Sequence, residues 1–408
     1  MKVRHRAILT AAALFAAAMG YAHAAATQEQ ETRFRAFLSA FRDDALRAGI
    51  NAQTYDSAIA NIDVNTRVQE LNERQPEFVR PVWDYLAGAV SNTRIVKGRE
   101  MIAANEALFS RLQNSYGVKR EVLAAIWGLE SNYGQNTGTF NIFEALATLA
   151  YDGGRTTFGR RQLIAALKIA QEQGRNPATM TSSWAGAMGH TQFIPTTYLE
   201  HAVDGDGDGK RDVWDSPADA LASAANYLKE SGWRGERFWG EEAKLPASFP
   251  FEQAEPNTRK TLDAWGAMGV TKPSGEAFSG SEPAFIFLPA GHRGPAFLAT
   301  GNFNAILRYN NATSYALAVG MLSDLLGGGM ALVAEWPRDE FPLDARQNTA
   351  LQEGLTALGF DTGGSDGVFG QRSRTALRDY QRSRGLAPDG FPTPELLTRI
   401  LNERGSRQ

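Results

Sequence analysis

Apolar residues recur at helical spacing through most of this 408-residue chain, whereas strand-like alternation is scarce. This pattern gives each helix one apolar face and favours helices packed on helices. We expect helices in the body at residues 31–46, 95–112, 121–129, 142–149, 161–171, 218–228 and 314–326. Two apolar runs, 284–288 and 296–299, flank a turn with Pro and Gly and indicate a β-hairpin. The predicted fold class is mainly α (α+β), with a small β element.

The length and the breaks in the pattern predict more than one domain. Glycines at 327–329 and a Pro-containing stretch to residue 342 precede a new helical pattern from Arg346, and residues 373–384 predict another helix. We therefore expect a body at 27–330, a linker at 331–345 and a small unit at 346–404. The sequence shows no longer repeat array.

The N-terminus has the pattern of a secretory signal peptide over residues 1–26. Lys2, Arg4 and Arg6 precede an apolar stretch that is too short to span a membrane, and an Ala-x-Ala pattern follows. The chain contains no Cys, which excludes a lipid-modified cysteine and a disulfide framework. We expect export to the periplasm as a soluble protein without a transmembrane anchor.

The composition is that of an ordinary folded protein. It is 43% hydrophobic and 21% charged, with a net charge of −3, so nothing indicates a nucleic-acid-binding surface. The balance of charges does not identify a partner.

Residues 127–134, WGLESNYG, place a carboxylate on an otherwise apolar helix face. Val122, Ile126 and Glu130 fall at i, i+4 and i+8, so Glu130 continues that face toward the helix end. Burial favours the protonated carboxyl, which is the form that a general acid needs to protonate a glycosidic oxygen. A Glu that ends the helix and points to water fits the same spacing.

Most glycosidases use two carboxylates. Asp152 and Glu144 are the candidates for a second one, but each also fits a loop or helix-surface position. A mechanism with a single acid therefore remains open.

Residues 182–195 combine two closely spaced glycines with hydrogen-bonding and aromatic side chains. Such glycines let the backbone approach a ligand, and the neighbouring polar and flat side chains match a sugar. A tightly packed helix pair with small residues at the crossing is the alternative, and residues 302–311 admit the same two interpretations. His190, inside the first stretch, is interpreted as a pocket-wall residue.

The run DGDGDGKRD at 204–212 matches the start of an EF-hand calcium loop. Alternate carboxylates converge on a hard cation, and Lys210 would offer its carbonyl. Asp215 stands at the twelfth position instead of Glu, so Asp219 is the candidate that closes the site. We predict a structural Ca²⁺ and no organic cofactor, against the alternative of a solvated turn.

With these motifs in order, the body resembles the lytic murein transglycosylase B family (glycoside hydrolase family 103). The resemblance rests on GLESNYG, AGAMG followed by QFIP, the Asp-rich loop ending in VWD, ANYL, and NFNAILRYN. The tail, with DGVFG, TAL, YQ and DG, resembles the type 1 peptidoglycan-binding domain. The family implies a lysozyme-like helical catalytic core followed by a small helical peptidoglycan-binding domain.

The resemblance also implies roles for residues that match the family motifs. Glu130 matches the catalytic acid/base. Only Arg155 matches a pair of arginines found in relatives, because Gly154 takes the first position, and His190 stands where an aromatic residue is common. The implied sugar-groove residues are Arg155, Ser183, Gln192, Phe193, Tyr227, Tyr309, Asn310 and Tyr315, and the implied calcium ligands are Asp204, Asp206, Asp208, the Lys210 carbonyl and Asp219.

The implied reaction cleaves the MurNAc–GlcNAc β-1,4 bond of peptidoglycan and forms a 1,6-anhydromuramic acid end, with one Glu as acid and then base. The alternatives are a lysozyme-like muramidase, which adds water, and a non-catalytic murein-binding protein. The expected partner is the peptidoglycan glycan strand and not nucleic acid. The sequence does not identify partners among cell-wall synthesis or division proteins.

Overall fold

The computed structural model describes residues 26–73, 80–235 and 237–406. The predicted signal peptide therefore lies, except for its last residue, outside the described residues. The chain divides into two compact units, each formed by segments distant in the sequence. We call residues 26–73 with 96–231 the helical unit, and residues 80–95 with 232–406 the sheet unit.

The helical unit consists mainly of helices, and it includes α5 from residue 96 onward. Its helices are α1 (Gln28–Arg47), α2 (Ala52–Ile59), α3 (Thr66–Glu73), α5 (Asn92–Ala104), α6 (Glu106–Tyr116), α7 (Arg120–Ser131), α8 (Ile142–Tyr151), α9 (Thr156–Gln173), α10 (Pro195–His201) and α11 (Pro217–Glu230). A 3-10 turn, η1 (Pro177–Thr179), and a two-stranded sheet of β1 (Phe140–Asn141) and β2 (Thr181–Ser182) complete it.

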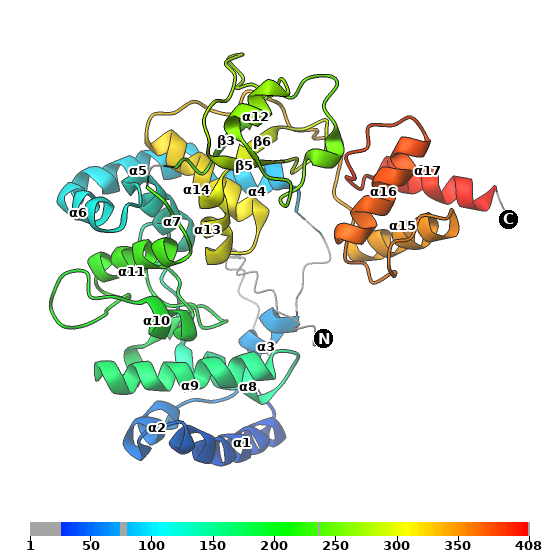
Figure 1. Cartoon of the computed structure of the whole chain (residues 1–408). Helices are drawn as coiled ribbons and strands as arrows, with labels where there is room; N and C mark the ends of the chain where they lie inside the picture. Colours follow the sequence, from blue (N-terminus) through cyan, green and yellow to red (C-terminus); the bar gives the residue numbers. More distant parts are fainter. Residues whose placement is uncertain (1–25, 74–79, 236, 407–408) are drawn as a thin grey trace. The chain divides into compact units, whose positions relative to one another are not determined.

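Helices α8 and α9 form the centre of this unit (Figure 1). Nearly every residue of α8 is buried, as its almost wholly apolar sequence requires. The two helices approach so closely that a Cβ at Gly159 would lie 2.4 Å from the backbone nitrogen of Ala150. Helices α1 and α2 pack on one side of this pair and α10 packs against α9 on another.

The expected helices of the body are all present, with one interruption. The run 95–112 is divided between α5 and α6 at Asn105, where φ is −122° and the side-chain amide donates to the carbonyl of Met101 at 2.9 Å. An Asn side chain competes with the helix for backbone groups, which explains the break within a continuous apolar pattern.

The sheet unit carries an antiparallel sheet with the strand order β3-β6-β5-β4. Its elements are α4 (Val82–Ala89), β3 (Gly240–Ala243), η2 (Phe251–Gln253), β4 (Lys260–Thr261), α12 (Leu262–Ala267), β5 (Pro283–Phe287), β6 (Ala296–Ala299), α13 (Gly301–Tyr309) and α14 (Thr313–Leu326). The predicted hairpin is confirmed as β5 and β6. Strands β3 and β4 were not predicted, because they are short and pair with partners distant in the sequence.

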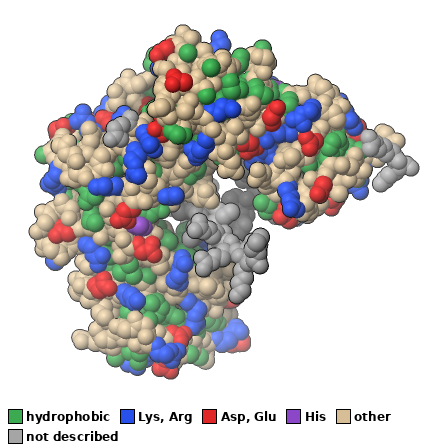
Figure 2. Space-filling model, in the orientation of Figure 1, with side chains coloured by type: hydrophobic (Ala, Val, Ile, Leu, Met, Phe, Trp, Pro, Cys, Tyr) green, Lys and Arg blue, Asp and Glu red, His purple; other side chains and the backbone are tan. Residues whose placement is uncertain are grey.

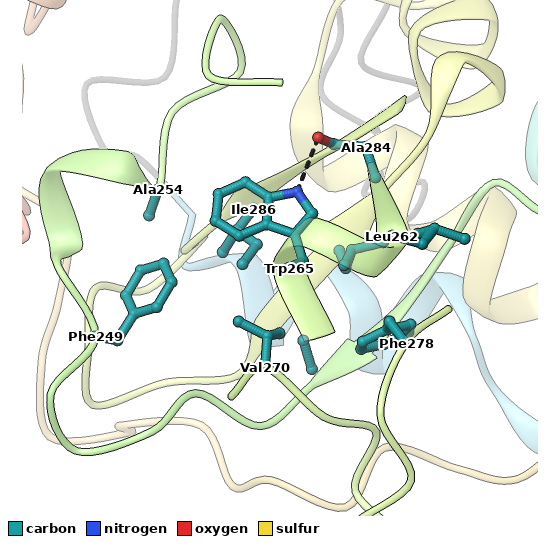
Figure 3. Close-up of a cluster of buried hydrophobic side chains, with 10 residues drawn as sticks. Phe249, Ala254, Leu262, Trp265, Val270, Phe278, Ala284 and Ile286 are labelled. Carbon is teal, nitrogen blue, oxygen red and sulfur yellow. Dashed lines mark hydrogen bonds between the residues drawn. The ribbon is translucent and has the colours of Figure 1, made fainter. Parts of the chain in front are cut away.

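Both faces of this sheet are buried. Ile286 and Leu298, paired across β5 and β6, face a cluster that contains Trp265 of α12 (Figure 3). The indole nitrogen of Trp265 donates to the carbonyl of Ala284 at 3.0 Å, so its polar atom is satisfied within the core. Alternation along β5 sends Phe287 to the other face, against Phe303 of α13.

The C-terminal module, residues 345–405, consists of α15 (Ala345–Ala357), α16 (Gln371–Ser383) and α17 (Pro394–Gly405). Helices were predicted from Arg346 and at 373–384, and both are confirmed. Leu351, Leu355, Leu377, Tyr380 and Ile400 form its buried core. The three helices thus enclose an apolar centre of their own.

The segment before the module is bound to the rest of the sheet unit. The backbone amides of Val333 and Ala334 donate to the carboxylate of Glu242, each at 2.7 Å. The ring of Trp336 stacks on Phe297, with centroids 6.5 Å apart. The predicted linker is therefore anchored by polar and aromatic contacts.

The described surface agrees with the near-neutral charge of the chain. On the face in Figure 2, basic and acidic side chains are interspersed. Within the described ranges, no helix combines the length and the apolar character needed to cross a bilayer.

Candidate active site

The sequence places Glu130 in the last turn of α7, and its side chain is half-buried. The two turns at residues 122–128 are entirely buried, so the helix is fixed in the core. The negative end of a helix dipole lies at the C-terminus, where it disfavours a carboxylate relative to the protonated carboxyl. Glu130 therefore lies half-buried at the negative end of the α7 dipole.

The chain reverses sharply after Glu130. Asn132 and Tyr133 both have positive φ, 51° and 61°, which side chains other than glycine seldom adopt. Tyr133 folds back over the helix, with its ring edge-to-face against Trp127 at 5.8 Å. Lys97 donates to the carbonyl of Asn132 at 3.1 Å and lies over the Tyr133 ring. These contacts hold the strained backbone that follows Glu130 in the chain.

The two candidate second carboxylates have ordinary structural settings. Glu144, in the first turn of α8, accepts a hydrogen bond from the side-chain amide of Asn65 at 2.6 Å. Asp152 is exposed at the C-terminal end of the same helix and accepts from the amide of Gly153. Neither setting indicates a role as nucleophile or base.

Residues 183–193 form a folded loop rather than a helix. Met188 and Phe193 pair as an isolated antiparallel bridge, with the amide of Met188 donating to the Phe193 carbonyl at 2.9 Å. The glycines serve packing within the protein: a Cβ at Gly186 would lie 2.6 Å from Leu146, and one at Gly189 would lie 2.1 Å from the carbonyl oxygen of Val213. The helix-pair interpretation is wrong, because the chain turns at both glycines with positive φ.

The loop brings several of the predicted groove residues together. Ser183 accepts hydrogen bonds from two backbone amides of the loop. Gln192, at φ 50°, donates its side-chain amide to the carbonyls of Gly189 and Thr137 at 2.8 and 3.2 Å. Phe193 is buried, and its ring packs against Tyr227 of α11 at 5.9 Å. Tyr227 also meets His201 edge-to-face.

Arg155, also predicted for the groove, lies with its guanidinium 5.4 Å from the centroid of the Trp184 ring. This cation–π contact connects the start of α9 to the same loop. Trp184 was not among the predicted site residues. The presence of a Trp beside the two glycines was the sequence signal for this residue. Its contact with Arg155 can be seen only in the structure.

Tyr309, Asn310 and Tyr315 belong to the sheet unit. The rings of Tyr309 and Tyr315 stack nearly parallel, with centroids 6.5 Å apart and 8° between planes. Asn310 is buried and ends α13. These three predicted residues thus come together where α13 meets α14.

A link between the loop and α7 was also missed. The indole nitrogen of Trp127 donates to Nδ1 of His190 at 3.0 Å, and Ser131 donates to the carbonyl of His190 at 2.7 Å. His190 was predicted only as a pocket-wall residue. The two partners lie far from it in sequence, so no local pattern could reveal the contact.

The Asp-rich loop precedes α11 and gathers carboxylates at one point. One oxygen from each of Asp204, Asp206, Asp208 and Asp219 lies within 4.8 Å of the others. Asp219 is buried, and burial raises the pKa of its carboxyl. It also accepts from the amides of Gly205 and Asp212 at 2.8 and 2.6 Å, which tie the loop to the helix.

This arrangement fits a bound calcium ion. The donors are hard oxygens, and the converging negative charges, one of them buried, call for a cation to offset their repulsion. Asp215 instead pairs with Arg175 at 2.7 Å, which agrees with Asp219 as the residue that closes the loop. The carbonyl of Lys210 was the fifth predicted ligand, and the amide of Lys210 donates to Asp208.

Two family models match the chain, one in the body and one in the C-terminal module. Residues 33–324 match the family model of the transglycosylase SLT domain. The chain belongs to the transglycosylase SLT domain family. Residues 347–400 match the putative peptidoglycan-binding domain. The predicted resemblance is therefore confirmed, as is the mainly helical, lysozyme-like fold with a small β element.

Relatives of this SLT-domain protein include enzymes of known structure. The protein is 48% identical to SltB3 from Pseudomonas aeruginosa in complex with NAG-anhNAM-pentapeptide, with a TM-score of 0.87 over 90% of this chain and 99% of that chain. It is 28% identical to Slt35 from Escherichia coli in complex with calcium, with a TM-score of 0.61 over 71% of this chain and 92% of that one.

A curated relative, membrane-bound lytic murein transglycosylase B of Escherichia coli K12, is 33% identical over 223 residues, or 53% of this chain. This SLT-domain protein spans 59% of the length of that relative.

Proposed function

We propose that the protein is a lytic transglycosylase that cleaves the MurNAc–GlcNAc β-1,4 bond of peptidoglycan and leaves a 1,6-anhydromuramic acid end. The observation that carries the proposal is the likeness to SltB3, whose complex contains NAG-anhNAM-pentapeptide. An anhydro sugar is the product that distinguishes this reaction from hydrolysis. The family assignment and the setting of Glu130 support the same reaction.

Glu130 acts first as general acid. Its carboxyl proton passes to the glycosidic oxygen, the bond from the muramic anomeric carbon to that oxygen breaks, and the GlcNAc hydroxyl leaves. Positive charge then develops at the anomeric carbon. The half-buried position of Glu130 at the C-terminal end of α7 supports this role.

Glu130 next acts as base. Its carboxylate accepts the proton of the muramic C6 hydroxyl while O6 bonds to the anomeric carbon, and the carboxyl is restored without consuming water. The nucleophile belongs to the substrate, so its effective molarity replaces a second carboxylate or a positioned water. This accounts for the ordinary settings of Glu144 and Asp152.

The remaining predicted residues bind the glycan. The proposed binding residues of the folded loop are Ser183, Gln192 and Phe193. Ser183 and Gln192 offer polar groups to sugar rings, and the buried ring of Phe193 packs against Tyr227, also a proposed binding residue. The proposed substrate-binding set is completed by Arg155, Tyr309, Asn310 and Tyr315. The loop at Asp204, Asp206, Asp208, Lys210 and Asp219 holds a structural Ca²⁺, supported by the cluster of carboxylates and by the calcium in Slt35.

The proposed organisation is a signal peptide at 1–26, a catalytic domain at 27–330, a linker at 331–345 and a peptidoglycan-binding domain at 346–404. The basic, apolar N-terminus supports export to the periplasm, where the substrate is found. Peptidoglycan strands are the proposed partner of both domains, supported by the peptide-bearing glycan fragments in the SltB3 complexes and by the C-terminal family match.

The test is digestion of purified murein followed by mass spectrometry, with the wild type and Glu130→Gln. We expect anhydro-muropeptides from the wild type and a loss of at least about 10²-fold in rate for the variant, because the amide cannot transfer the proton. Murein binding should persist in Glu130→Gln. Products with reducing muramic ends would identify a muramidase, and an unchanged rate would exclude Glu130 as the acid.

A further inference from the structure

His190 belongs to the loop that carries the proposed groove residues, but its ring is turned toward α7. Nδ1 accepts the indole hydrogen bond of Trp127 at 3.0 Å, with the rings edge-to-face at 5.8 Å. An indole N–H only donates, so Nδ1 must be unprotonated. His190 therefore acts here as a neutral imidazole whose proton is on Nε2.

The backbone of His190 makes a second bond to the same helix. Ser131 donates its hydroxyl to the His190 carbonyl at 2.7 Å and accepts from the amide of Gly134 at 2.9 Å. Trp127 and Ser131 lie three residues before and one residue after Glu130. One residue of the loop thus holds the helical turn on both sides of the proposed acid.

Close packing leaves His190 little freedom. A Cβ added to Gly134 would lie 2.3 Å from Cε1 of the imidazole, and the His190 amide donates to the carbonyl of Val213 at 2.9 Å. Trp127 is 2% exposed, so loss of its partner would leave a buried donor unsatisfied. The contact is therefore part of a rigid arrangement.

The electrostatic setting agrees with a neutral ring. Burial lowers the pKa of His190, while Asp215 and Asp212 act in the opposite direction. Both carboxylates are bonded to Arg175, at 2.7 and 2.8 Å, which limits their effect on the imidazole. Nδ1 is thus available as an acceptor near neutral pH.

We propose that His190 is a positioning residue for Glu130, which fixes the last turn of α7 relative to the loop of Ser183, Gln192 and Phe193. The inference rests on the proposed role of Glu130. The side-chain bond to Trp127 and the carbonyl bond to Ser131 set the direction from which the carboxyl meets the scissile oxygen. Displacement of a catalytic group by about 1 Å costs up to about 10²-fold in rate.

The experiment compares His190→Phe with His190→Asn on a soluble NAG–NAM glycan of defined length. Phe keeps a planar ring of similar size but removes the acceptor, whereas Asn places its Oδ1 close to the position of Nδ1. We expect His190→Phe to lower kcat by about 10- to 100-fold while KM changes less than about threefold. His190→Asn should recover most of the lost kcat.

Trp127→Phe removes the donor of the same hydrogen bond. Combined with His190→Phe, it should cost less than the sum of the two single losses, because both changes delete the same hydrogen bond. Thermal unfolding of each variant shows whether the protein has remained folded. If His190→Phe does not fold, Trp127→Phe, which removes the donor, is compared instead with His190→Asn, which keeps an acceptor.

A normal kcat in folded His190→Phe would overturn the inference, as would equal losses in the Phe and Asn variants or fully additive losses in the double variant. Glu130→Gln separates the two proposals. If Glu130→Gln is inactive and His190→Phe is fully active, only the positioning role fails. If Glu130→Gln retains activity, the proposed acid itself is wrong.

Discussion

At the residue scale, the turn behind Glu130 depends on glycines placed beneath bulky rings. A Cβ on Gly128 would lie 2.6 Å from Cζ of Tyr133, and a Cβ on Gly134 would meet His190. The strained backbone at Asn132 and Tyr133 persists because these rings are packed from both sides. The WGLESNYG motif is therefore a packing requirement, apart from the catalytic role proposed for Glu130.

Gly128→Ala is expected to be destabilising even though Gly128 lies inside a helix. Helix propensity favours Ala by about 1 kcal/mol. Forcing the Tyr133 ring away from the new methyl group costs about 1–3 kcal/mol. We expect a net loss of up to about 2 kcal/mol in the free energy of unfolding, measured by denaturant titration, together with reduced turnover.

Gly88→Ala in α4 is the matched control. Gly88 is exposed, and its added Cβ would meet only an Arg80 nitrogen at 3.6 Å, an ordinary contact. Only the propensity gain should remain, so this variant should be as stable as the wild type or more stable. Equal effects of the two substitutions would contradict the role assigned to Tyr133.

At the element scale, the Asp-rich loop and α11 depend on each other. The buried carboxylate of Asp219 in the first turn of α11 receives amides of the loop, and Ser216 caps the helix while donating to Asp206 at 2.8 Å. Because α11 carries Tyr227, the stability of the loop bears on a proposed groove residue. A cation at this point would thus support both the helix and the groove.

Calcium should raise the melting temperature of the protein, and a chelator should lower it. Calcium at about 100 times its Kd would add about 2.7 kcal/mol to the free energy of unfolding. For a unit of this size that corresponds to a shift of roughly 5–10 °C, measured by calorimetry with and without chelator.

Two substitutions in the loop distinguish a predicted calcium ligand from a neighbouring carboxylate. Asp206→Asn removes one converging carboxylate and should weaken the calcium response. Asp215→Asn removes a carboxylate of the same segment that is bonded to Arg175, so the calcium response should persist. A melting temperature insensitive to calcium in the wild type would refute the metal site.

At the scale of the whole molecule, the C-terminal module is bonded to the sheet unit of which it forms part. Asp389, buried in the module, accepts from the backbone amide of His292 at 2.8 Å and contacts its Nδ1 at 2.6 Å. Gln381 donates to the same carboxylate, and Arg378 donates to Glu255. With the anchored segment at Val333, these bonds favour a fixed position over a free tether.

The His292–Asp389 pair should stabilise the protein in a limited pH window. The hydrogen bond to Asp389 raises the pKa of His292, so its contribution is present below about pH 6.5 and is lost as pH rises through the raised pKa. Hydrogen bonds lower the pKa of Asp389 despite its burial, so its contribution is present above about pH 4 and is lost as pH falls through the lowered value.

His292→Gln tests this window. The variant should be less stable than the wild type at about pH 5.5, by less than about 1 kcal/mol because the histidine is partly exposed. The difference should shrink at about pH 8.5, because less of the wild-type imidazole is protonated there. Denaturant unfolding at both pH values measures it, and a difference that grows with pH would contradict the ion pair.

The sequence by itself determined the elements whose information is local. Continuous helical spacing predicted α7, α8, α11 and α14, and alternating apolar runs predicted the β5–β6 hairpin. The order of the motifs also led to the family. The sequence also placed Glu130 on an apolar helix face, although the spacing did not decide between a general acid and a Glu that points to water.

Only the tertiary structure decided which residues meet. Trp127 and His190 are 63 positions apart, and Gly189 is required because the carbonyl of Val213 approaches it. Strand β3 exists because it pairs with β6, although its own sequence, GEEA, contains no residue that favours a strand. Periodicity and propensity act over a few residues, whereas these contacts depend on how distant segments pack, and packing is not encoded in any one of them.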